Sequence, residues 1–251
     1  MVTDQTPQMT LNPSSVARAL GTVAALLVLA NTVALMATYL TGRTPHDVRF
    51  AQLFYLDGER NIPTAFSTLL LLFAALLLAV ITALERKRTG SAVLPWAVLS
   101  CGFLFMAVDE AWSFHEKLTG PVRTLLGNAD LGVFYYSWVI PAIGLVLVLG
   151  LFFFRFLLRL PAKTKFTFLM AAILFLGGAI GIELIEGRFD ELHGDRNLTS
   201  GLTAPVQETL EMAGVIVLIW GLLVYLADQY KEVRIRFERE SRNHDRRPTG
   251  P

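Results

Sequence analysis

Six long, mostly apolar runs dominate this chain and decide what it can fold into. They cover about 19–40, 63–84, 92–113, 131–154, 166–187 and 206–227. Each run is close to the ~20 residues that an α-helix needs to cross a hydrocarbon core of ~30 Å. Only 17% of the residues are charged, whereas a soluble domain carries nearer ~25%. The sequence therefore predicts an all-α, polytopic integral membrane protein built as a bundle of six transmembrane helices.

The segments that flank these runs are polar and predict a simple division of the chain. We expect a disordered cytoplasmic N-terminus over 1–15, a six-helix transmembrane domain over 16–228, and a basic cytoplasmic tail over 229–251 that is first helical and then disordered. The single cysteine excludes an internal disulfide and a cysteine-based metal cluster. In the fifth run, Gly177-x-x-x-Gly181 predicts close packing against a neighbouring helix.

Lysine and arginine residues are shared unevenly between the two sides that six crossings define. Fifteen of the 22 lie in the N-terminal segment, the second and fourth linkers and the C-terminal tail, and seven lie on the other side. Because basic residues favour the cytoplasmic side, both termini are predicted to be cytoplasmic (N-in/C-in). We expect a multi-pass protein of the cell inner (plasma) membrane, with the lipid bilayer as partner and no nucleic-acid partner. An oligomer is compatible with this interpretation.

Acidic residues stand at the ends of three runs, and the predicted orientation puts all of them on the outer side. A carboxylate inside hydrocarbon costs ~2.5–3.5 kcal/mol on insertion scales, so an intramembrane acid points to a functional site. Helical spacing puts Asp109 and Glu116 on one face of the third run, with Glu110 on a neighbouring face. The acids of the fifth run, and likewise those of the sixth, are three residues apart and share one face. We expect the three helices to direct these acids at a single site. The acids are Asp109, Glu110 and Glu116 on the third run, Glu183 and Glu186 on the fifth, and Glu208 and Glu211 on the sixth.

Carboxylates gathered in this way have to be neutralised by a divalent cation or by protons. Oxygen ligands with one or two imidazoles favour a hard or borderline ion, so we expect Fe or Mn first, then Ca or Mg, and zinc less. The predicted metal ligands are the seven acids and His115. Nearby residues that could support them are Ser113, Tyr135, Asp190, His193 and Arg188.

Two of the acidic pairs have the same spacing, Glu183-x-x-Glu186 and Glu208-x-x-Glu211. Their chemistry resembles that of the ferritin-like di-iron and di-manganese carboxylate proteins, which use Glu-x-x-His twice. This chain has no Glu-x-x-His, and it also lacks the His-x-x-x-His pair of the alkaline-ceramidase-like membrane hydrolases. We assign it to neither family.

Three functions therefore stay open at this stage. The first is an outward-facing metal site between the third, fifth and sixth helices, which in an enzyme would serve an oxidoreductase or a hydrolase. The second is a proton-coupled transporter of a small solute that uses the same acids as proton acceptors. The third is a structural or assembly subunit of a membrane complex.

Overall fold

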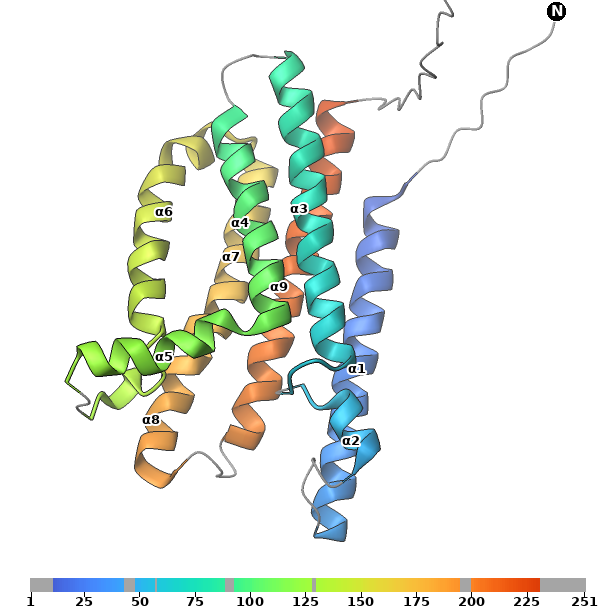
Figure 1. Ribbon diagram of the computed structural model, residues 1–251. Coiled ribbons are helices and arrows are strands. Elements are labelled where there is room, and N and C mark those ends of the chain that lie inside the picture. Colours follow the sequence, from blue (N-terminus) through green and yellow to red (C-terminus); the bar gives the residue numbers. More distant parts are fainter. Residues whose placement is uncertain are drawn as a thin grey trace, which may run out of the picture.

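The computed structural model describes residues 11–42, 48–56, 58–88, 93–127, 130–194 and 200–230, and over these ranges the fold is all-helical (Figure 1). Within them, six helical stretches are long and apolar enough to cross a membrane, as a multi-pass membrane protein requires. They are α1 (Pro13–Thr41), α3 (Ile62–Arg88), α4 (Val93–Trp112), α6 (Val139–Arg159), α7 (Ala162–Leu176) with its continuation to His193, and α9 (Ser200–Gln229).

Shorter elements complete the described chain. They are α2 (Arg49–Phe54), α5 (Phe114–Leu125), the 3₁₀ turn η2 (Gly132–Phe134), the π-helical segment η3 (Gly177–Ile182) and α8 (Glu183–His193). The fourth spanning helix begins at Val139 and not near position 131, because the residues before it form η2 and further turns. The fifth continues through η3 and α8 well beyond Gly187, where the apolar run ends.

The two described ends of the chain lie at the same end of the bundle (Figure 1). Helix α1 starts at Pro13, and the Asn12 side chain caps it by accepting hydrogen bonds from the backbone N–H groups of Ser14 and Ser15. The helix thus begins inside the segment predicted to be disordered. Residues 1–10 and 231–251, which hold the rest of that segment and nearly all of the basic tail, lie outside the described residues. Which side of the membrane the termini occupy stays a prediction.

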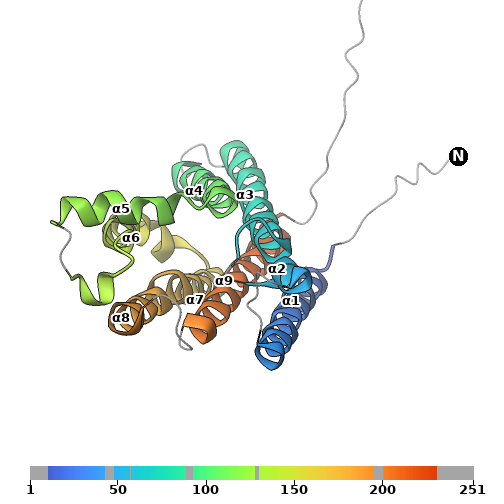
Figure 2. The same ribbon diagram turned by 60° about the horizontal axis from the view of Figure 1, so that its bottom comes forward.

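Helix α9 lies in the middle of the bundle and packs against α1, α3 and α7, while α4 packs against α3 (Figures 1 and 2). The centre of the core is made of large apolar side chains that are almost fully buried, such as Leu78, Ile219 and Leu222. Trp96 of α4 is 2% exposed and joins four helices, because its ring contacts the rings of Phe156, Phe168 and Tyr225.

Glycines allow the fifth and sixth spanning helices to approach closely, but they are not the predicted pair. An added Cβ at Gly177 or Gly181 would meet nothing within 4 Å, so the predicted Gly-x-x-x-Gly contact is wrong. The close contacts occur at Gly178, Gly214 and Gly221, where an added Cβ would lie 2.6–2.8 Å from an atom of the facing helix. Small residues at these three positions let the two backbones come together.

A buried carboxylate anchors the end of the bundle at which the described chain starts and stops. Glu85 of α3 is 3% exposed and accepts hydrogen bonds from the hydroxyls of Tyr225 (2.8 Å) and Tyr230 (2.7 Å). The guanidinium of Arg88 lies 3.4 Å from the same oxygen. These contacts satisfy the charge locally, as a buried carboxylate requires.

Candidate functional site: an acidic cavity

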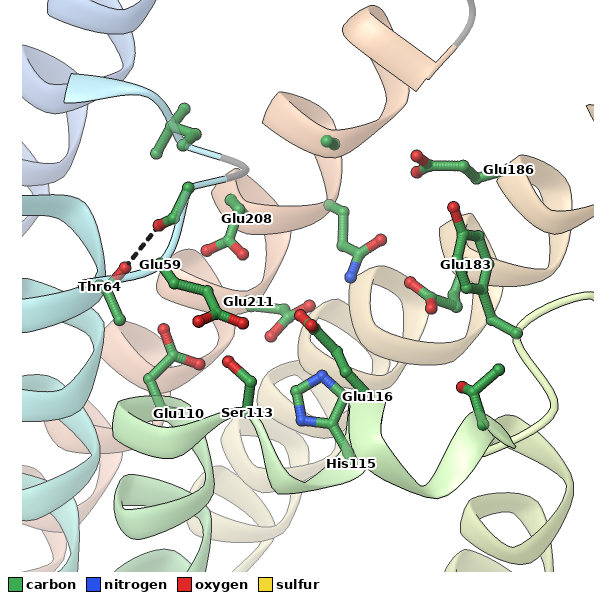
Figure 3. A pocket seen from close by; sticks show the side chains of 16 residues that line it. Glu59, Thr64, Glu110, Ser113, His115, Glu116, Glu183, Glu186, Glu208 and Glu211 are labelled. Atoms are coloured by element: carbon green, nitrogen blue, oxygen red, sulfur yellow. Dashed lines mark hydrogen bonds between the residues drawn. The ribbon is translucent and has the colours of Figure 1, made fainter. Parts of the chain in front are cut away.

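A cavity of ≈ 510 Å³ lies toward the opposite end of the bundle, where α5 turns away from the lower end of α4 (Figures 1 and 3). We call it the acidic cavity because glutamate is the commonest residue on its wall. The glutamates on its wall are Glu59, Glu110, Glu116, Glu183, Glu186, Glu208 and Glu211. The wall also carries His115, which is the one basic side chain among the described lining residues, and the polar groups of Thr64, Ser113, Thr119, Tyr136 and Gln207.

A sharp backbone turn brings the end of α4 and the start of α5 to the cavity. Ser113 separates the two helices in the left-handed conformation, with φ 47° and ψ 51°. That region is uncommon for a residue other than glycine and costs free energy unless its surroundings enforce it. The turn brings His115 and Glu116 of α5 to the same space as Glu110 of α4 (Figure 3).

The turn is fixed by Asp109, which holds His115 with both carboxylate oxygens. One oxygen accepts the backbone N–H of His115 at 2.9 Å, and the other lies 2.6 Å from its ring Nδ1. Asp109 itself is not on the cavity wall. Because Nδ1 is engaged, the second ring nitrogen, Nε2, is the one directed into the cavity (Figure 3). A carboxylate behind the imidazole is the usual arrangement for a metal-ligating histidine, and it also suits a general base.

The charges around the cavity shift the protonation of the groups on α5. Burial lowers the pKa of His115, but the hydrogen bond and the charge of Asp109, with the carboxylates of Glu116 and Glu183, outweigh it and raise the pKa above its ordinary value. Burial raises the pKa of Glu116, and the nearby carboxylates of Glu59 and Glu183 raise it further, while His115 acts in the opposite direction. Both groups therefore hold their protons more tightly than in an unfolded chain.

Side chains behind the wall orient the glutamates of α8. The indole N–H of Trp138 donates to Glu183 at 3.0 Å, and the ring of Trp138 packs on the His115 imidazole with centroids 4.6 Å apart. The Thr203 hydroxyl donates to Glu186 at 2.9 Å. Glu183 and Glu186 are thus held by the residue directly before α6 and by a residue of α9, as well as by their own helix.

Two local features place the acids of α8 and α9 next to each other. Segment η3 is π-helical, a widening of the helix that often marks functional sites, and it ends directly before Glu183. In the same segment, an added Cβ at Gly178 would lie 2.9 Å from Cγ of Glu211. The missing side chain at position 178 therefore lets Glu211 lie against η3.

A family model described as "Domain of unknown function (DUF8692)" matches residues 19–226. The chain belongs to this family. The matched DUF8692 range contains every residue that lines the acidic cavity. No curated protein and no solved structure is similar to the chain.

The structure brings most of the predicted site residues together. Glu110, Ser113, His115, Glu116, Glu183, Glu186, Glu208 and Glu211 line the acidic cavity. Asp109 and Asp190 lie one layer behind the wall, where Asp190 accepts the hydroxyl of Tyr136 at 2.6 Å.

Three predicted supporting residues lie away from the cavity wall. The Tyr135 ring faces the guanidinium of Arg123, Arg188 pairs with Glu191, and the His193 ring lies 3.2 Å from the carbonyl oxygen of Phe189. Sequence reasoning missed Glu59, which comes from the segment between α2 and α3. Its position in a polar linker on the predicted outer side was the signal that could have indicated it.

The glutamates surround the cavity without converging on one point. Among the described residues, no three His, Cys, Asp or Glu side chains stand close enough to share a metal ion as they are positioned. The cavity falls within the ~300–1,000 Å³ range of small-ligand sites. An ion bound here would keep part of its water shell, or the glutamates would rotate toward it.

Proposed function

We propose that the chain is a multi-pass membrane protein that binds a cation in the acidic cavity. The observation that carries this proposal is the charge balance of the wall, where seven glutamates face a single histidine. Like charges at this spacing repel, and at the end of a membrane bundle water screens them poorly. A cation in the cavity removes this repulsion, and His115 is the one basic side chain among the described lining residues.

A divalent metal ion is the cation we put first. Carboxylates and one imidazole suit Mn or Fe, while Ca or Mg would bind through carboxylates and retained water. His115 Nε2, backed by Asp109, would supply the nitrogen. Glu110, Glu183 and Glu211 come from three spanning helices and would supply oxygen from separate directions. In an enzyme, such an ion would activate bound water.

In the proposed N-in/C-in orientation within the inner membrane, the cavity opens to the outer side. A proton-coupled transporter, the second function considered from the sequence, would use the same acids. It would also need polar groups leading from the cavity to the other side of the membrane. The groups below the cavity on α4, α6, α7 and α9 that line the next internal space are apolar. We therefore rank transport second, and the structural or assembly subunit third.

Mn²⁺ binding to the purified protein in detergent tests this function. Titration followed by calorimetry or EPR should give saturable binding, and Glu211→Gln should weaken it at least about tenfold, or ~1.4 kcal/mol. Asp228→Asn is the matched control, because this carboxylate lies at the other end of α9 and is 59% exposed beside Lys163. No Mn²⁺, Fe²⁺, Ca²⁺ or Mg²⁺ binding by the folded parent, or equal affinity in Glu211→Gln, would overturn the assignment of a divalent metal ion to the acidic cavity.

A further inference from the structure

A partly open space close to the acidic cavity has the opposite chemistry. It has a volume of ≈ 360 Å³ and lies among α4, α6, α7 and α9, with one residue of α3. All of its described lining residues are apolar, and we call it the apolar groove. Met106, Leu145, Phe153, Phe175 and Val215 represent its walls.

The groove exists because α6 is attached to the bundle at its two ends. At one end Phe156 packs edge-on against Trp96, with ring centroids 5.0 Å apart. At the other end Trp138, directly before the helix, packs on His115 and donates to Glu183. Between these contacts α6 stands apart from α4 and α7 (Figures 1 and 2), and its inner face lines the groove.

The groove and the acidic cavity follow one another along the same helix faces. On α4, Met106 lines the groove and Glu110 lines the cavity; on α9, Val215 lines the groove and Glu211 the cavity. Each pair is four residues apart, which puts both members on one face at a distance of one turn. An elongated molecule with its chain in the groove would therefore have its polar end at the glutamates.

Water in contact with walls of this kind is unfavourable, because exposing apolar surface to water costs free energy in proportion to its area. The walls offer water no hydrogen-bond partner. At membrane depth, the available filler is hydrocarbon. The groove extends from Leu145 to Leu157 along α6, about 18 Å at ~1.5 Å per residue, which is close to the depth of one leaflet of a ~30 Å core.

From this we infer that the apolar groove holds the hydrocarbon chain of a lipid whose head carries a protonated amine, and that the amine lies in the acidic cavity. This inference rests on the proposed function, because the ammonium group is then the cation that the glutamates bind. Lipid tails are as apolar as leucine, so moving a chain from bilayer to groove contributes little affinity. The head group therefore has to supply the binding affinity, and seven glutamates attract an ammonium group and repel a phosphate or carboxylate.

Photolabelling with a matched set of probes tests the inference. The probes are a long-chain alkylamine, the alcohol and the fatty acid of the same chain, each with a diazirine in the chain. They are applied to the full protein in detergent without divalent ions. We expect the amine to label groove residues of α6 and α7 most and the fatty acid least, with labelled peptides identified by mass spectrometry. Stronger labelling by the fatty acid would place the head at the basic end of α6 and overturn the inference.

Two glycines of α6 provide a blocking variant and its control. An added Cβ at either Gly150 or Gly144 meets nothing within 4 Å, but only Gly150 is on the wall of the groove. Gly150→Phe should lower amine labelling at least about tenfold, because the ring takes up the volume that the chain needs, and Gly144→Phe should leave it unchanged. Equal labelling in the two variants would overturn the inference.

The two proposals can fail separately. Mn²⁺ binding with no Gly150-sensitive amine labelling leaves the cation site standing and ends the lipid inference. Amine labelling that Gly150→Phe blocks and Glu211→Gln lowers supports the lipid inference, whether or not a metal binds. If Gly150→Phe blocks amine labelling but Glu211→Gln leaves it unchanged, the head of the lipid lies elsewhere and the lipid inference is overturned.

Discussion

Replacing Gly178 by alanine probes the contact that places Glu211. An added Cβ at this position would lie 2.8 Å from the carbonyl oxygen of Gln207 and 2.9 Å from Cγ of Glu211. Favourable carbon contacts lie at ~3.5–4.0 Å, and the oxygen belongs to a helix backbone, so α9 has to move. Overpacking costs ~1–3 kcal/mol, whereas the alanine gains up to ~1 kcal/mol of helix propensity. We therefore expect Gly178→Ala to lower the free energy of unfolding by up to ~2 kcal/mol.

Gly177→Ala is the matched control, because an added Cβ there meets nothing within 4 Å. Both variants gain similar helix propensity, so the difference between their unfolding free energies isolates the overlap with α9. Unfolding by SDS titration, followed by far-UV circular dichroism, measures this difference. Mn²⁺ affinity should fall in Gly178→Ala and stay unchanged in Gly177→Ala, since only the former displaces Glu211. Equal stability of the two variants would refute the close approach of η3 and α9.

Three further changes test separate parts of the structure. The pKa of His115 is raised in the fold, so its pairing with Asp109 stabilises the protein below the unfolded pKa of ~6.5. This contribution is lost as the pH rises through the pKa of the folded protein. Asp109→Asn should therefore flatten the profile of stability against pH over that range, and an unchanged profile would contradict the pairing. Trp138→Phe keeps a ring but removes the donor to Glu183, and should cost ~1.5–3 kcal/mol in unfolding free energy; a loss below measurement error would speak against that bond. Lys87→Cys, in a protein without its native cysteine, should react with a membrane-impermeant maleimide only after cells are opened, and labelling of intact cells would reverse the predicted orientation.

Much of the architecture follows from sequence patterns whose physical cause is local. A run of ~20 apolar residues is sufficient to predict a spanning helix, because backbone groups in hydrocarbon must satisfy one another. The acidic pairs stand out for a similar reason, since carboxylates within an apolar run are costly unless something compensates them. Glu110, Glu183 and Glu211 were therefore identifiable before any helix was placed, and each lines the acidic cavity.

The tertiary structure decided the role of several residues whose local sequence is uninformative. Asp109 and Glu110 are adjacent acids in the same sequence surroundings. In the structure, Asp109 holds His115 from behind, whereas Glu110 lines the cavity. Their roles differ because the left-handed turn at Ser113 brings the start of α5 next to Asp109, whereas Glu110 faces the cavity. Glu59 is an ordinary loop acid until the segment before α3 is packed over the cavity.

Helix packing likewise depends on neighbours that the chain order does not reveal. Gly177 and Gly181 have the spacing of a packing motif, but Gly178 is the residue that faces α9. The apolar groove arises only because α6 is attached at its ends and stands apart between them. Apolar length and charge spacing thus determined the six helices and most of the acids, because those signals act within one segment. Which acids meet, what holds them and what space adjoins them are properties of several segments together, and only the packed bundle decides them.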